Sequence, residues 1–442
     1  MSEVPKLSTR TAVGYAVGDF GINLYFISTL TFLLIFYTDV MGISAAAAGG
    51  VFALARFVDA VTDPLMGMLA ERTRTRWGRM RPYILWGALP LGVISVLTFT
   101  VPDLNESGRV LWAYVTYILF GILFTLVGIP YSTLTASLTD DHDERTRLST
   151  IRIGLAFAGG FLCSVGMPFL VQQFDDPAQG YQWVMVGFAV IATVSLGVTF
   201  SQTREVVQPP ERERLSLKLS MKCVFLNPPL LVVMGMFCLG MLAFTVRQTS
   251  TAYFFTYNVG DPSLISLFFG VTLAVMLVGI WSVPWLADRF GKAGAARLGA
   301  YFGLIGCIGF YLTPPDAVVM IFVWGCVMAL GGTPIAVLGW AMIPDTVEYA
   351  LWRHGARADG AIYSMASFFQ KLAKTVGGAG VAFALAAAGY VANAAVQTPD
   401  AANAVHAMMS LVPGGILVLL IILTHYHRLD SDAHAKLVAD VG

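Results

Sequence analysis

Long runs of apolar residues, separated by short polar segments, follow one another along the whole chain. A bilayer core about 30 Å thick needs roughly 20 apolar residues per helix, so each run predicts a membrane-spanning helix. We predict twelve spans, at 11–38, 44–70, 82–101, 110–138, 149–173, 182–201, 228–257, 263–287, 294–313, 317–344, 361–394 and 403–426. The first run is too long for a signal peptide and contains Asp19 and Asn23, so we interpret it as a retained span.

The composition agrees with this pattern and excludes several classes of protein. Hydrophobic residues make up 57% of the chain and charged residues 12%, whereas about a quarter of an average soluble domain is charged. The net charge is zero and no basic tract alternates with aromatic residues, so nucleic-acid binding is not predicted. The five cysteines form no CxxC pair, and no HExxH, GxSxG or P-loop motif occurs. We therefore predict an all-α membrane protein that is neither an enzyme nor a holder of a cofactor.

Lysine and arginine concentrate in alternate loops, which predicts the orientation in the membrane. The loops between these basic loops carry mainly acidic residues, with Arg109 as their single cation. By the positive-inside rule, both termini lie in the cytoplasm. The basic loops follow spans two, four, six, eight and ten and contain Arg72, Arg74, Arg76, Arg79, Arg81, Arg145, Arg147, Arg204, Arg212, Arg214, Lys218, Lys222, Arg289, Lys292, Arg297, Arg353 and Arg357.

The two halves of the chain resemble each other. Span two runs into the sequence LAER at 69–72, and span eight runs into LADR at 286–289. Parallel repeats of six helices are typical of transporters that bind a solute between the halves. We predict one six-helix bundle at 1–201, a cytoplasmic linker at 202–226 and a second bundle at 227–442.

Charged residues inside span two predict a cation site. Asp59 and Asp63 are one helical turn apart, and Arg56 lies one turn earlier. Two carboxylates this close in a low dielectric need a shared proton or a bound cation. Oxygen ligands suit Na⁺, and the hydroxyl of Thr62 or Thr125 would complete the shell. The alternative is a structural triad in which Arg56 neutralises one carboxylate.

Other polar residues within the spans predict solute binding. Asp19 and Asn23 share one face of span one, although Asp19 could instead pair with an arginine of a neighbouring helix. Arg152, Arg247 and Lys371 lie at the start of or inside later spans, where an unpaired cation is costly. Lys371 could pair electrostatically with Asp59 and Asp63 and so link the cation site to the solute site.

Several short strings resemble the glycoside–pentoside–hexuronide:cation symporter family over nearly the whole chain. The most specific are ARFVDAVTDP at 55–64 and RTRWGRMRP at 74–82. Supporting strings are GDFGINL at 18–24, FYTDV at 36–40, IPY at 129–131, DTVEY at 345–349 and YS at 363–364. The resemblance implies a major facilitator fold of two six-helix bundles. It also implies alternating-access symport of a sugar or glycoside with Na⁺, Li⁺ or H⁺.

The resemblance also implies roles for particular residues. The family's cation site corresponds to Asp59, Asp63 and Thr125, while Thr62 replaces an asparagine that supports Na⁺ binding in one member, melibiose permease. The solute set comprises Asp19, Asn23, Ser132, Arg152, Arg247, Gln248 and Lys371. The coupling and gating set comprises Arg56, Asp345, Glu348, Arg357 and Lys371.

The predicted solute site departs from that of melibiose permease. Two galactoside-binding carboxylates fall at Asn23 and Gly128, and a stacking tryptophan falls at Ser132. The loss of these carboxylates predicts a more positive site suited to a hexuronide or sulfo-sugar. If Asp19 cancels one of the positive charges, a neutral glycoside or pentoside is expected instead.

The nearest alternative function is a lipid or lysolipid transporter on the same fold. For either function the expected partners are a small solute, a monovalent cation, Na⁺ or H⁺, and the lipid bilayer. We expect a monomeric, multi-pass protein of a bacterial inner membrane.

Overall fold

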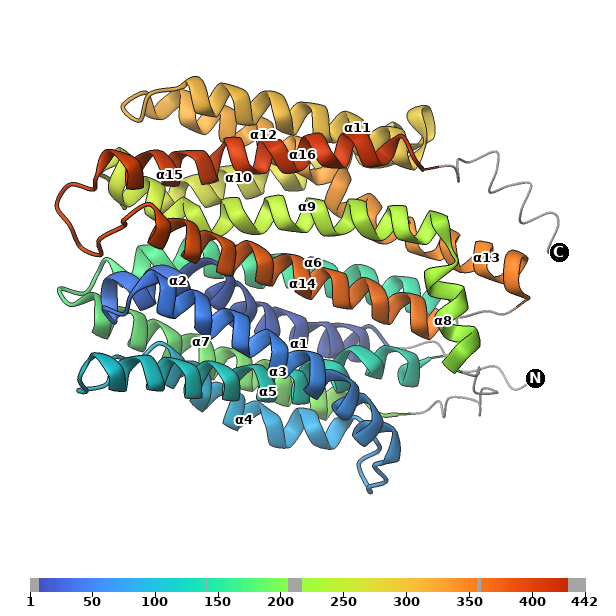
Figure 1. The fold of residues 1–442 in the computed structure, drawn as a ribbon. Coiled ribbons are helices and arrows are strands. Elements are labelled where there is room, and N and C mark those ends of the chain that lie inside the picture. The colour runs from blue at the N-terminus through green and yellow to red at the C-terminus, as the bar shows by residue number, and fades with distance from the viewer. Residues whose placement is uncertain (1–7, 140–141, 206–216, 356–358, 428–442) are drawn as a thin grey trace. The chain divides into compact units, whose positions relative to one another are not determined.

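The computed structural model describes residues 8–139, 142–205, 217–355 and 359–427. These ranges are helical apart from their turns and connections, and they contain no β-strand. The chain divides into two compact units, Met1–Arg212 and Glu213–Gly442, which we call the N-terminal and C-terminal units. Within each unit the long helices run side by side (Figure 1).

The N-terminal unit is built from long helices that begin at polar caps. Ser8, Ser44, Asn105 and Asp176 each accept a hydrogen bond from a backbone N–H in the first turn that follows. The helices are α1 (Thr9–Ile27), a π-helical turn (Ser28–Phe32), α2 (Leu33–Ile35), a second π-helical turn (Phe36–Val40), α3 (Ala45–Arg72), α4 (Arg81–Thr98), α5 (Glu106–Leu138), α6 (His142–Val171) and α7 (Pro177–Gln202).

The C-terminal unit begins with a short helix and continues with longer ones. Its elements are α8 (Leu217–Phe225), α9 (Pro228–Tyr253) with a π-helical end (Phe254–Val259), α10 (Leu264–Ile280), α11 (Val283–Leu312), α12 (Val318–Ala341), α13 (Ile343–His354), α14 (Asp359–Ala387), α15 (Pro399–Met409) and α16 (Leu411–Thr424).

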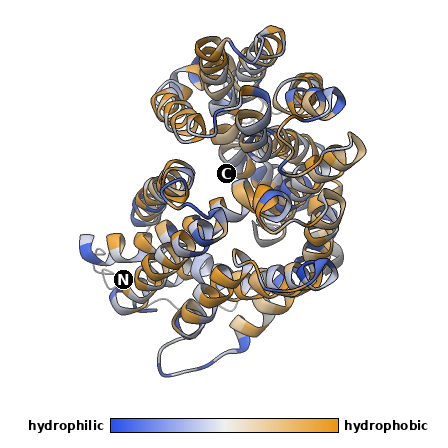
Figure 2. Cartoon of the chain, turned by 90° about the vertical axis from the view of Figure 1, so that its left-hand side faces the viewer, coloured by the Kyte–Doolittle hydropathy of each residue, from blue (hydrophilic) through white to orange (hydrophobic). Residues whose placement is uncertain are grey.

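The helices are apolar enough to account for a multi-pass membrane protein. Among the described residues, 10 helical segments are long and apolar enough to cross a bilayer. Helix α10 is shorter, with 17 residues, and α14 carries Lys371 and Lys374 in its first half. Figure 2 shows hydrophobic ribbon along most helices and hydrophilic ribbon mainly at their ends. With α10 and α14 included, the chain has the twelve spans of the predicted fold class.

Three predicted boundaries in the C-terminal unit are wrong: the end of span eight, the start of span nine, predicted at 294, and the end of span eleven, predicted at 394, where α14 ends at Ala387. Span eight was expected to reach residue 287, but α10 ends at Ile280 and α11 begins at Val283. Pro284 lies in the first turn of α11, where its missing N–H costs no hydrogen bond. Gly291, with a φ of +70°, then kinks α11. The LADR string therefore opens a helix, whereas LAER ends α3.

The packing of α1 determines where the polar residues of the N-terminal unit meet. Helix α1 packs against α6 and α7, while α5 packs against α3 and α4. Gly18 permits a close approach between α1 and α5, because a Cβ there would lie 2.5 Å from the Tyr131 ring. The result is two polar clusters inside one unit, one on α1, α5 and α6 and the other on α3 and α5.

Candidate functional site

The first cluster pairs Arg56 with Asp59 on α3. Arg56 Nη1 lies 2.7 Å from Asp59 Oδ2, and Arg56 Nη2 donates to the Tyr117 hydroxyl of α5 at 3.3 Å. Asp59 is 7% exposed, so a partner is needed to offset the cost of burying its charge. The pairing matches the alternative in which Arg56 neutralises one carboxylate.

The second carboxylate of α3 contacts a different partner. The Thr125 hydroxyl of α5 donates to Asp63 Oδ1 at 2.8 Å. Thr62 instead directs its hydroxyl at the backbone carbonyl of Asp59, 3.5 Å away on its own helix. The structure thus brings Thr125, and not the Thr62 side chain, to the predicted carboxylates. Within the described residues, no group of three or more His, Cys, Asp or Glu side chains gathers as a metal site.

A glycine of α5 leaves the space that the Asp59 carboxylate occupies. A Cβ on Gly121 would lie 2.8 Å from Asp59 Oδ1, closer than van der Waals contact allows. The carboxylate therefore packs directly against the backbone of α5, beside Arg56 and Tyr117. A side chain at residue 121 would displace it.

We expect Gly121→Ala to weaken cation binding roughly tenfold, because the added methyl group displaces the Asp59 carboxylate, one of the two predicted cation ligands. Gly187→Ala is the matched control, since a Cβ on Gly187 meets nothing within 4 Å. Both changes gain about 1 kcal/mol of helix propensity, so the comparison isolates the displaced carboxylate. The measurement is the Na⁺ concentration, or the pH, at which binding of the expected sugar reaches half of its maximum. Equal values for the two variants would contradict the prediction.

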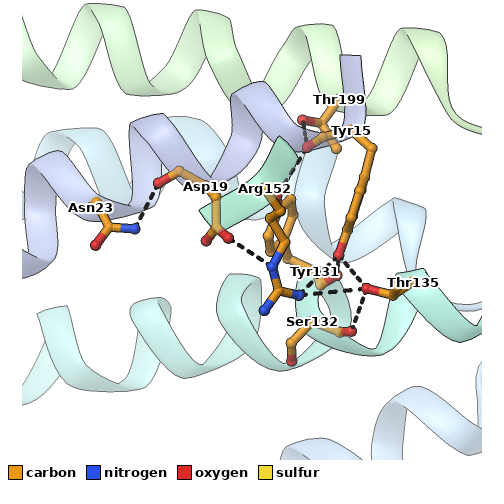
Figure 3. A network of polar contacts seen from close by, with 8 residues as sticks. All are labelled: Tyr15, Asp19, Asn23, Tyr131, Ser132, Thr135, Arg152 and Thr199. Atoms are coloured by element: carbon orange, nitrogen blue, oxygen red, sulfur yellow. Dashed lines mark hydrogen bonds and ion pairs between the residues drawn. The ribbon is translucent and has the colours of Figure 1, made fainter. Parts of the chain in front are cut away.

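The other cluster joins α1, α5 and α6 around Arg152 (Figure 3). Arg152 Nε lies 2.8 Å from Asp19 Oδ2, an ion pair without a well-aligned hydrogen bond. Its Nη1 donates to the Tyr15 hydroxyl at 3.3 Å and to Thr135 Oγ1 at 3.5 Å. The side chain of Asp19 is 16% exposed and that of Arg152 is 29% exposed. The two charges therefore neutralise each other while remaining partly accessible.

Two tyrosines form the rigid floor of this cluster. The Tyr15 hydroxyl donates to the Tyr131 carbonyl at 3.1 Å, and the Tyr131 hydroxyl donates to the Tyr15 carbonyl at 2.9 Å. Their rings stack with centroids 4.9 Å apart. Thr199 of α7 adds a hydrogen bond to the Tyr15 carbonyl at 3.3 Å. This interlock fixes the position of the hydroxyl that Arg152 contacts.

Asn23 and Ser132 lie beside this cluster, but in the described part of the chain neither forms a hydrogen bond to the side chain of Arg152 or Asp19. Asn23 Nδ2 donates to the Asp19 backbone carbonyl at 2.9 Å, one turn back on α1. The Ser132 hydroxyl donates to the Ile129 carbonyl at 2.9 Å and is exposed. Both side chains border the cluster in Figure 3. Their positions suit hydrogen bonds to the hydroxyls of a sugar.

The remaining predicted solute residues belong to the C-terminal unit. Arg247 and Gln248 follow each other on α9, and Lys371 lies on α14. Arg247 Nη1 is buried and has no hydrogen-bond partner among the described residues. Gln248 is 9% exposed, and Lys371 is partly buried. The predicted pairing of Lys371 with Asp59 and Asp63 stays a prediction.

Asp345, a predicted gating residue of the C-terminal unit, forms a short ion pair with Lys292. Lys292 Nζ lies 2.8 Å and 2.7 Å from the two carboxylate oxygens of Asp345, linking α11 to α13. Glu348 is on the same helix, α13, one turn after Asp345. Arg357 lies outside the described residues. The pair ties the kinked start of α11 to α13.

Several residues of these clusters were missed by the sequence analysis. Tyr15 and Thr135 contact Arg152, and Tyr117 contacts Arg56. Tyr131 bonds in turn to Tyr15. Outside the clusters, Glu205 accepts hydrogen bonds from three backbone N–H groups at the start of α4, those of Arg79, Met80 and Arg81. Aromatic residues in an apolar span look like ordinary lipid-facing or core residues. Glu205 stands alone after span six, with no pattern to mark it.

Comparisons with known proteins identify relatives over the whole chain. A family model described as MFS/sugar transport protein matches residues 14–431. The isoprimeverose transporter of Lactiplantibacillus pentosus is 36% identical, covering 97% of this chain and 90% of that protein. A glucuronide carrier protein homolog of Escherichia coli is 32% identical, covering 99% and 96%. A crystal structure of a D-xylose-proton symporter matches with a TM-score of 0.67 at 15% identity, covering 94% and 96%.

Proposed function

This chain belongs to the MFS/sugar transport protein family and is a cation-coupled sugar symporter, not an enzyme; we propose that it carries a neutral glycoside or pentoside inward together with Na⁺ or H⁺. The family is the one that the sequence resembles. We further infer that the protein acts as a monomer in a bacterial inner membrane with both termini in the cytoplasm.

The neutral substrate is supported by the ion pair between Asp19 and Arg152. An unpaired arginine would favour a carboxylate or sulfonate group. Here Asp19 lies 2.8 Å from the guanidinium and cancels its charge. A carboxylate that accepts and a guanidinium that donates together bind neutral hydroxyl groups, which both donate and accept. The relative named as an isoprimeverose transporter is consistent with such cargo.

The cation site is supported by Asp63 and Thr125. Arg56 forms an ion pair with Asp59 at 2.7 Å, while Asp63 accepts a hydrogen bond from the uncharged hydroxyl of Thr125. A bound Na⁺ or H⁺ would offset the Asp63 charge and compete with Arg56 for Asp59. Because sugar and cation clusters both include residues of α5, binding at one shifts the helix that the other uses. We propose this shared helix as the route of coupling.

An anionic sugar is the second candidate. Arg247 Nη1 is buried without a described partner, and a carboxylate of the cargo would satisfy it. The relative named as a glucuronide carrier homolog is consistent with this cargo. A lipid or lysolipid cargo is not favoured, because the matching family model describes sugar transport.

The first test is the thermal stability of the purified protein with neutral glycosides, pentosides, hexuronides and sulfo-sugars, each with and without Na⁺ at two pH values. A ligand that binds only the folded state stabilises it by mass action, by about 2.7 kcal/mol at a hundredfold excess over Kd. We expect the largest shift with a neutral glycoside or pentoside, increased by the coupling ion. Stabilisation by anionic sugars alone would overturn the neutral substrate.

A further inference from the structure

An apolar groove opens beside the basic loop that joins α3 to α4. It has a volume of about 540 Å³ and is lined by Thr73, Thr75, Trp77, Pro82, Tyr83, Trp86, Gly87, Pro90, Leu123 and Leu126. These residues come from the loop, from α4 and from α5. The groove contains none of the charged residues of the two clusters described above, so neither cluster accounts for it.

The walls of the groove continue onto the lipid-facing surface. Trp86 is 66% exposed and Leu89 is 65% exposed, and the neighbouring α5 residues Val115 and Leu119 are also exposed. From Pro82 to Pro90 the groove follows nine residues of α4, about 13 Å at 1.5 Å per residue. That length reaches from the membrane surface well into the hydrocarbon core. An acyl chain would find apolar contact along the whole of it.

The open end of the groove is strongly basic. Arg74 and Arg76 alternate with the lining residues Thr73, Thr75 and Trp77, and both arginines are exposed. Neither forms an ion pair with a described residue. The Arg76 guanidinium lies over the Trp77 ring, 4.5 Å from its centroid, which orients it beside the groove. The guanidinium groups of Arg74 and Arg76, beside this apolar groove, therefore complement a lipid with an anionic headgroup.

We propose that this groove binds an anionic phospholipid, with the phosphate held by Arg74 and Arg76 and one acyl chain lying along Trp86, Pro90, Leu123 and Leu126. The lipid is a bound component of the surface and not the transported cargo. The basic loop follows α3, the helix that carries Asp59 and Asp63. Occupancy of the groove therefore tethers the end of the cation-binding helix to the membrane surface.

The test measures lipid retention by the full-length protein, using native mass spectrometry with dioleoylphosphatidylglycerol, dioleoylphosphatidylcholine and soluble glycerol phosphate. We expect phosphatidylglycerol to bind most tightly. Each arginine near an anionic headgroup contributes about fivefold, so Arg74→Gln/Arg76→Gln should weaken that binding roughly thirtyfold. Arg10→Gln/Arg353→Gln, which removes two exposed charges from helices that do not line the groove, should leave it unchanged.

A second variant separates the apolar wall from the charged end. Trp86→Ala removes an exposed ring, so folding should survive, and it should weaken phosphatidylglycerol binding without creating affinity for glycerol phosphate. Equal binding of both phospholipids, or equal loss in the two double variants, would overturn the proposal. Glycerol phosphate binding as tightly as phosphatidylglycerol would also overturn it, because the site would then recognise free phosphate.

Discussion

Asp63→Asn is expected to abolish uphill accumulation of the sugar, bringing the ratio of internal to external sugar to about one because the coupling free energy is lost. The amide keeps the size of the side chain and can still contact Thr125, which donates to Asp63 at 2.8 Å. It removes the negative charge that the proposed cation site would use. The measurement is sugar uptake into proteoliposomes with an imposed Na⁺ or pH gradient.

The control for this prediction is Thr62→Val on the same helix. The Thr62 hydroxyl bonds to the backbone of its own helix, so its loss should leave the cation dependence close to that of the unaltered protein. Sugar exchange without a gradient should persist in Asp63→Asn, which separates lost coupling from lost folding. Undiminished uphill uptake by Asp63→Asn would remove Asp63 from the cation site.

Arg152→Gln is expected to weaken sugar binding by a factor on the order of a hundred, because it removes the guanidinium proposed to donate to the sugar hydroxyls, and a hydrogen bond to a charged group contributes about 1.5–3 kcal/mol. The change leaves Asp19 partly buried without its cation and removes donors from the hydroxyl cluster of Tyr15 and Thr135. Equilibrium sugar binding and thermal unfolding of the purified variant would be measured together.

The double variant Asp19→Asn/Arg152→Gln distinguishes a binding role from a structural one. It removes both charges, so thermal stability should return toward that of the unaltered protein while sugar binding stays weak. Thr133→Val, which removes a hydroxyl bonded to its own helix, provides a variant of small expected effect. Sugar binding restored by the double variant would assign the ion pair to stability alone.

The sequence by itself determined the class of protein and most spans. Apolar runs of membrane length are a local property, so the segment Thr9–Val40 and the helices α3 to α5 begin and end within four residues of their predicted limits. The error at span eight has a local cause as well, since Pro284 and Gly291 mark a new helix start and a kink within an apolar run. The spacing of Arg56, Asp59 and Asp63 was also readable, because helical periodicity places them on one stripe.

Only the tertiary structure decided which partners these charges take. Arg56 could have paired with either carboxylate, and its contact with Tyr117 of α5 accompanies the choice of Asp59. Thr62 and Thr125 were equal candidates until packing of α5 on α3 brought one hydroxyl to Asp63. Asp19 meets Arg152 because α1 packs closely on α6, where a Cβ on Gly159 would clash with the Phe20 carbonyl oxygen. Apart from Arg56–Asp59, these contacts join residues more than sixty positions apart, and no local periodicity encodes them.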